Sequence, residues 1–199
     1  VEDGTTIWSQ QYNRTMNDAF QIQDEIARSI STRIEVELAG DQALADVVNA
    51  ESIDPEAYEA YLKGRFYWNK RNFQGFQQAR NKFLEAIELD PNFAEAHAGL
   101  ADTYSLMASY GYMEADDAYE RAKDAAERAL EINYQLAEAI TSLAFVYHHD
   151  EDIKDLDRAE QLYQQAIEAN PNYASAHHWY SNLLIETGRD EESLEEIER

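Results

Sequence analysis

The fold of this chain is decided by two nearly identical pentapeptides, Asp90-Pro91-Asn92-Phe93-Ala94 and Asn170-Pro171-Asn172-Tyr173-Ala174. Each follows an Ala-Ile-Glu stretch, at 86–88 and at 166–168. Looser copies stand at 54–57, which reads Asp-Pro-Glu-Ala, and at 131–134, where Tyr134 takes the proline position. The junctions lie 36, 43 and 37 residues apart, which indicates an array of internal repeats.

Each repeat unit carries two segments with apolar residues at helical spacing. In the second unit they are Ala94, Ala98, Ala101 and Tyr104 for the first segment, and Ala122, Ala126 and Ala129 for the second. The small residues let helix backbones approach closely. One helix pair cannot bury its apolar face alone, so neighbouring pairs must stack. The pattern therefore predicts an all-α fold of stacked antiparallel helix pairs.

The units resemble tetratricopeptide repeats. The third unit carries the consensus most fully, with Leu143, Ala144, Tyr147, Ala159, Tyr163, Ala166 and Pro171. In the first unit Gly64 and Arg65 fall where the consensus has Leu-Gly. The resemblance implies a right-handed superhelix over 54–199, with about three full repeats and a truncated fourth.

Residues 1–53 do not repeat. Residues 5–12 are typical of a short strand, and Ile22, Ile26, Ile30, Ile34 and Leu38 follow at helical spacing. This stretch resembles the end of a TolB amino-terminal-like domain, which in similar proteins precedes tetratricopeptide repeats. We therefore expect a strand-helix remnant of an upstream domain at 1–40 and a linker at 41–53. The resemblance implies a larger signalling or regulatory protein of the adenylate cyclase or winged-helix type.

Charge and composition narrow the function. Asp and Glu total 40 against 16 Lys and Arg, for a net charge of −24. Such acidity opposes nucleic acid, and no apolar run is long enough to insert into a membrane. The acidity fits either a basic or apolar partner or adaptation to high salt. We expect a cytoplasmic protein with no cofactor and no catalytic residue, because no phosphate loop or nucleophile motif is present.

The resemblance implies a protein-protein interaction module that binds a peptide or protein in a concave groove. Family positions that face this groove correspond to Leu62, Phe66, Asn69, Lys70, Asp102, Leu106, Thr141, Phe145, His148, His178, Asn182 and Ile185. Tyr110, Tyr112 and Met113 lie in an inserted stretch. They either form a binding lip or fold back over the core between repeats.

Two alternatives stay open at this point. The segment with His148, His149, Asp150 and Asp152 offers imidazole and carboxylate groups to a divalent metal, or is simply a solvated acidic loop. The repeats could also be a self-association module that forms a homodimer without an external ligand. Separately, the truncated fourth unit is expected to leave an apolar edge, which could self-associate artificially; its residues are Tyr180, Leu184, Leu194 and Ile197.

Overall fold

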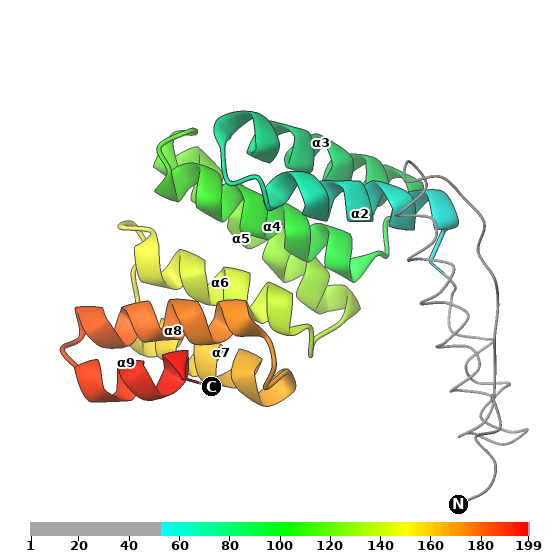
Figure 1. Ribbon diagram of the computed structural model, residues 1–199. Coiled ribbons are helices and arrows are strands. Elements are labelled where there is room, and N and C mark those ends of the chain that lie inside the picture. The colour runs from blue at the N-terminus through cyan, green and yellow to red at the C-terminus, as the bar shows by residue number, and fades with distance from the viewer. Residues whose placement is uncertain (1–52, 199) are drawn as a thin grey trace, which may run out of the picture. The chain divides into compact units, whose positions relative to one another are not determined.

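The computed structural model describes residues 53–198, which contain four antiparallel helix pairs and no strand. The pairs are α2 (Pro55–Trp68) with α3 (Phe73–Leu89), α4 (Ala94–Ser109) with α5 (Ala115–Ile132), α6 (Ala137–His149) with α7 (Leu156–Ala169), and α8 (Ala174–Glu186) with α9 (Asp190–Ile197). They stack in chain order, as Figure 1 shows. The predicted all-α superhelix of helix pairs is confirmed. The strand, helix and linker predicted at 1–53 lie outside the described residues, apart from Ile53.

Local sequence sets where several helices begin. Asp54 caps α2 by accepting hydrogen bonds from the backbone N–H groups of Glu56 and Ala57, at 2.8 and 3.2 Å. Asn72 caps α3 by accepting from Gly75 N at 2.8 Å, and Asp155 caps α7 by accepting from Arg158 N at 2.9 Å. Side-chain caps therefore fix the start of both helices of the first pair and of the second helix of the third pair, whereas the second and fourth pairs have none.

The three described junctions between pairs share one geometry. The backbone N–H groups of Phe93, Leu136 and Tyr173 donate to the carbonyl oxygens three residues earlier, at 3.0–3.1 Å. The side chains that close each turn are Asp90, Asn133 and Asn170, whose Oδ1 atoms accept from the N–H two residues later. Tyr134 thus replaces proline without changing the turn.

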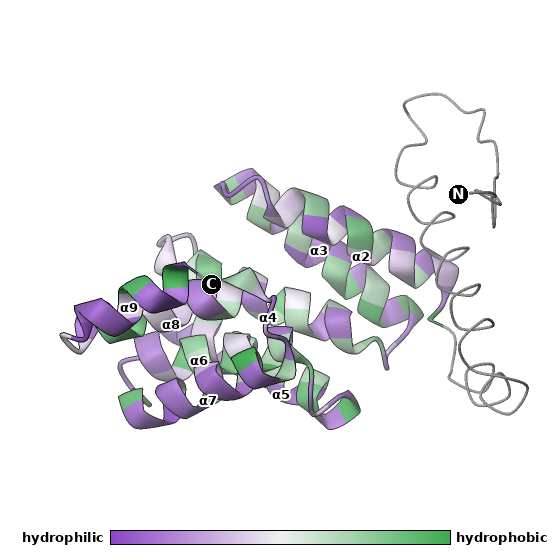
Figure 2. Cartoon of the chain, turned by 60° about the horizontal axis from the view of Figure 1, so that its bottom comes forward, coloured by the Kyte–Doolittle hydropathy of each residue, from purple (hydrophilic) through white to green (hydrophobic). Residues whose placement is uncertain are grey.

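The first helices of successive pairs form the inner side of the stack. Among the described helices, extensive contacts join α2 to α4, α4 to α6 and α6 to α8, but no comparable contacts join α3, α5 and α7 to one another. Elements on the inner side of a curved stack lie closer together, so the first helices line the concave face. Hydrophilic residues run along α7 and α9 in Figure 2.

One aromatic ring joins the first two pairs. Phe83 of α3 is fully buried, and a Cβ placed on Gly64 of α2 or on Gly99 of α4 would lie 2.6 Å from its ring. Both glycines therefore make room for the same side chain, which explains Gly64 where the repeat consensus has another residue. No helix of the described residues is long and apolar enough to cross a membrane.

Candidate functional site

The predicted groove residues lie on the inner helices or directly after α2, but their exposure differs along the stack. At the two ends Phe66, Asn69, Lys70, His178 and Ile185 are exposed, and Leu62 and Asn182 are half-buried. In the middle Asp102, Leu106, Thr141, Phe145 and His148 are buried. Helices α4 and α6 each pack between the first helices of the two adjacent pairs. Helices α2 and α8 each contact the first helix of only one adjacent described pair. The accessible part of this face therefore lies at its ends.

Asp102 is the most perturbed carboxyl group of the inner face. It is 8% exposed, and burial raises its pKa to about 6, although the positive charges of Arg65 and Arg71 lower it. The hydroxyl groups of Ser105 on α4 and Thr141 on α6 are also buried, and they have no hydrogen-bond partner among the described residues. The centre of the inner face thus holds polar groups whose burial destabilises the fold.

His148 and His149 are used inside the fold. His148 Nε2 donates to Glu186 Oε2 of the next pair at 3.0 Å, and Lys154 Nζ binds the other oxygen of that carboxylate at 3.0 Å. His149 Nδ1 donates to the Phe145 carbonyl at 3.0 Å. Burial lowers the pKa of both imidazoles, that of His149 to about 4. Both groups are therefore neutral near pH 7.

The histidine segment does not assemble a metal site. Asp150 Oδ1 accepts from the backbone N–H of Asp152 at 3.1 Å, as part of the turn after α6. No three His, Asp or Glu side chains converge on a point that could hold a metal ion anywhere in the part of the chain that the structure describes. The structure therefore gives the metal-sensing alternative no support.

The stretch predicted as a lip or a cover divides between the two roles. Tyr112 and Met113 are partly buried and pack on the core, whereas Tyr110 is 49% exposed. The rings of Tyr110 and Tyr112 stack at 5.7 Å, and Tyr112 meets Phe73 of α3 edge-on at 5.5 Å. The turn after α4 thus lies against the start of α3 and leaves one aromatic ring at the surface.

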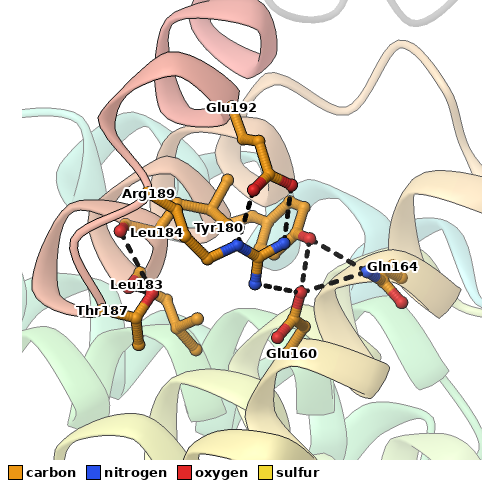
Figure 3. A network of polar contacts seen from close by, with 8 residues as sticks. All are labelled: Glu160, Gln164, Tyr180, Leu183, Leu184, Thr187, Arg189 and Glu192. Atoms are coloured by element: carbon orange, nitrogen blue, oxygen red, sulfur yellow. Dashed lines mark hydrogen bonds and ion pairs between the residues drawn. The ribbon is translucent and has the colours of Figure 1, made fainter.

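A polar network fixes the fourth pair on the third (Figure 3). Glu160 of α7 accepts hydrogen bonds through Oε1 from Tyr180 OH at 2.8 Å and from Arg189 Nη1 at 2.7 Å. Arg189 also binds both carboxylate oxygens of Glu192, at 2.7–2.8 Å. This network holds the α8–α9 turn and so positions Ile185 at the accessible end of α8.

The self-association edge predicted from the sequence is only half present. Tyr180 and Leu184 are buried against neighbouring helices, so that part of the prediction is wrong. Leu194 and Ile197 are 62% and 60% exposed. Beside Ile197 a hollow of ≈ 210 Å³ opens between the junction before α8 and the end of α9, with His178 in its wall.

Of the cations at the turn between α2 and α3, only Lys70 was predicted from the sequence as a site residue, whereas Arg65 and Arg71 were not. We call Arg65, Lys70 and Arg71 the cationic turn. Arg71 Cζ lies 3.6 Å from the centre of the Trp68 ring, and Arg65 Cζ lies 4.9 Å from it. Lys70 Nζ lies 4.7 Å from the Phe66 ring. The net charge of the whole chain conceals this region, but a count of charged residues in a short sequence window would have found it.

Comparison with known proteins supports the repeat assignment. Residues 82–122 and residues 152–199 each match a family model described as tetratricopeptide repeat. The first repeat domain of Spaghetti (RPAP3), solved with the HSP90 peptide SRMEEVD, superposes with a TM-score of 0.52 at 15% identity, over 70% of this chain and 99% of that one. This likeness shows the fold alone.

Two curated proteins are similar in sequence over part of their length. A Rhizobium meliloti (strain 1021) protein, provisionally named adenylate cyclase 3, is 34% identical over 103 residues, which are 50% of this chain and 17% of that protein. The transcriptional regulator HilA of Salmonella typhimurium is 27% identical over 139 residues, 69% of this chain and 24% of that protein. The chain thus spans a quarter or less of these relatives. The stacked helix pairs, their shared junctions and the two matching segments show that this chain contains tetratricopeptide repeats.

Proposed function

We propose that the helix pairs form a recognition module that binds a peptide or protein segment on its inner face and serves a larger cytoplasmic regulatory protein. The observation that carries the proposal is the exposure of inner-face residues at both ends of the stack, Phe66 and Lys70 at one and His178 and Ile185 at the other. These side chains are not needed to close the core. A fold neighbour that holds a peptide supports this use of the surface.

The regulatory setting rests on the two relatives. One is named as an adenylate cyclase and the other as a transcriptional regulator, and the segment similar to this chain is a minor part of each. We assign the helix pairs a sensory or scaffolding role, and we assign no catalytic step to them. The adenylate cyclase and winged-helix effectors, and the TolB-like segment at 1–40, remain predictions.

The binding surface can be tested with a phage-displayed random dodecapeptide library and the full chain. We expect selection to enrich specific peptides, and we expect Ile185→Ala or Phe66→Ala to weaken the best one at least tenfold, because interface anchors are few and carry most of the affinity. Fluorescence anisotropy of the synthetic peptide provides the dissociation constant. The matched control is Leu84→Ala on α3, which removes a 44% exposed side chain outside the inner face.

Two results would contradict peptide binding on the inner face. If no peptide is enriched, or if Leu84→Ala weakens binding as much as the inner-face variants do, then the inner face is not the recognition surface.

Self-association is the second candidate function, favoured by the exposed Leu194 and Ile197. Sedimentation velocity over a concentration range would show a dimer that Leu194→Glu disrupts.

A further inference from the structure

Positive charge in this chain is concentrated in one short segment. From Lys63 to Leu84, 22 residues contain six of the 16 Lys and Arg residues and no Asp or Glu. The whole chain has 40 acidic residues, so the rest of the sequence is strongly negative. The segment covers the end of α2, the turn and most of α3. The segment around the α2–α3 turn therefore differs in sign from the rest of the chain.

Only some of these cations are neutralised by neighbours. Lys63 pairs with Glu59 at 2.6 Å, and Lys82 pairs with Glu85. Within residues 53–198, by contrast, no ion pair to Asp or Glu is formed by Arg65, Lys70 or Arg71. Arg80 on α3 also has no such ion pair within these residues, but its Nε is buried and its Nη2 donates to Asn81 Oδ1. The cations at the turn itself that remain available to an anionic group are therefore those of the cationic turn.

Aromatic rings orient the cationic turn. Arg65 and Arg71 lie near the Trp68 ring, and Lys70 lies over Phe66 and Tyr67 at 4.7 and 4.8 Å. A guanidinium that lies against a ring can still present its N–H edge to a carboxylate. Arg71 also adopts φ = 49°, the one positive φ of a non-glycine residue in the described part of the chain. Such backbone conformations are costly and cluster at binding sites.

Exposed rings lie next to this turn in the sequence and in the fold. Phe73 follows Arg71 by two residues and is 44% exposed. It contacts Tyr112, whose ring stacks on the exposed Tyr110. A ligand on the cationic turn would therefore find apolar contact area beside the cations. A ligand that carries only carboxylates would not use this area, whereas one that also carries an apolar side chain would.

We propose that the cationic turn, with Phe73 and Tyr110, docks a short acidic segment of a partner protein that carries at least one aromatic or aliphatic side chain. This inference rests on the proposed recognition function and names its partner class. It differs from the preference for basic partners that the net charge of the whole chain suggests. A nucleic acid fits less well, because a long phosphate chain would extend past three cations onto a strongly acidic surface.

Asp102 competes with such a ligand. Arg65 and Arg71 are the cations that lower its pKa, so both lie within electrostatic reach of its buried carboxyl group. A ligand carboxylate must share these arginines with Asp102. Removing the charge of Asp102 therefore strengthens acidic ligands, whereas removing a cation of the turn weakens them.

The library selection provides the test. We expect the enriched peptides to be rich in Asp and Glu with one or more apolar residues. For the best synthetic peptide, Lys70→Gln/Arg71→Gln should raise the dissociation constant at least tenfold and Asp102→Asn should lower it severalfold. The control Lys123→Gln/Arg128→Gln makes the same charge change on α5, at cations paired with Glu127 and Glu131, and should have little effect. Circular dichroism confirms that each variant is folded, and Lys70→Gln alone serves if the double variant is not.

The outcomes separate the two proposals. Enrichment of basic or neutral peptides overturns the acidic partner but leaves the recognition function standing, whereas no enrichment overturns both. If the α5 control variant weakens peptide binding equally, the effect depends only on net charge, and the inference is also overturned. So would a single-stranded oligonucleotide that binds through Lys70 and Arg71 while acidic peptides do not. Concentration-dependent self-association that disappears in the double variant would name a second copy as the occupant and overturn the external partner.

Discussion

Phe83→Ala is expected to lower the free energy of unfolding by about 3–5 kcal/mol, the range for removing a fully buried aromatic ring. The Phe83 side chain has no exposed surface and is the contact that Gly64 and Gly99 accommodate from two different helix pairs. Its loss leaves a cavity at the boundary between the first two pairs. Urea unfolding followed by circular dichroism measures the change, and Leu84→Ala, at an exposed neighbour, should cost less than about 1 kcal/mol.

Replacing one of the two glycines by alanine should have the opposite effect on stability to the one that helix propensity alone predicts. Alanine in place of a mid-helix glycine ordinarily stabilises by about 0.5–1 kcal/mol. At Gly99 the new Cβ would lie 2.6 Å from the Phe83 ring, so we expect Gly99→Ala to destabilise instead. In a Phe83→Leu background the substitution should cost less. Stabilisation by Gly99→Ala in the wild-type background would show that the ring is not held between the two helices.

Asp102→Asn is expected to raise the free energy of unfolding at pH 7.5 by up to about 3 kcal/mol, the equivalent of a pKa displaced by roughly two units. Burial raises the pKa of Asp102 from 3.8 to about 6. Below pH 3.8 the carboxyl is protonated in both states and costs nothing. Between 3.8 and about 6 the unfolded chain loses its proton first, so wild-type stability falls as pH rises, and above 6 the full penalty remains.

The pH dependence of this difference is the decisive measurement. Wild type and Asp102→Asn are compared by urea unfolding at pH 3.5 and at pH 7.5, so that other titrating groups cancel. Asp124→Asn on the exposed side of α5 should change little at either pH. An equal effect of Asp102→Asn at both pH values would mean that the Asp102 carboxyl is not destabilised by ionisation.

The repeat architecture could be predicted from the sequence because its signals are local. The pentapeptides at 90–94 and 170–174 mark junctions that the structure shows, and Asn133 makes the same turn before Tyr134 that Asp90 makes before Pro91. His97 and His177 each lie six residues after the proline of a junction pentapeptide, and both bond through Nε2 to the carbonyl of that proline. Such features depend on a few neighbouring residues and on little else.

The accessible binding surface could not be predicted in the same way. A family position assigns a residue to the inner side, but the packing of α4 between α2 and α6, and of α6 between α4 and α8, decides whether solvent reaches it. Asp102 and Thr141 are buried for that reason, whereas Ile185 at the end of the stack is exposed. Of the cationic turn only Lys70 was predicted, and the cluster of positive charge was missed because a net charge averages over the whole chain.

The neighbour-only contacts between helix pairs also bear on how such a chain evolves. Extensive packing connects each described pair only to the next, and the three junctions are interchangeable turns of one geometry. A gene duplication with both breakpoints at such turns would insert a whole pair without disrupting a core elsewhere. The length of the array is therefore free to drift between relatives, while the residues at each boundary, such as Phe83 and its two glycines, must change together.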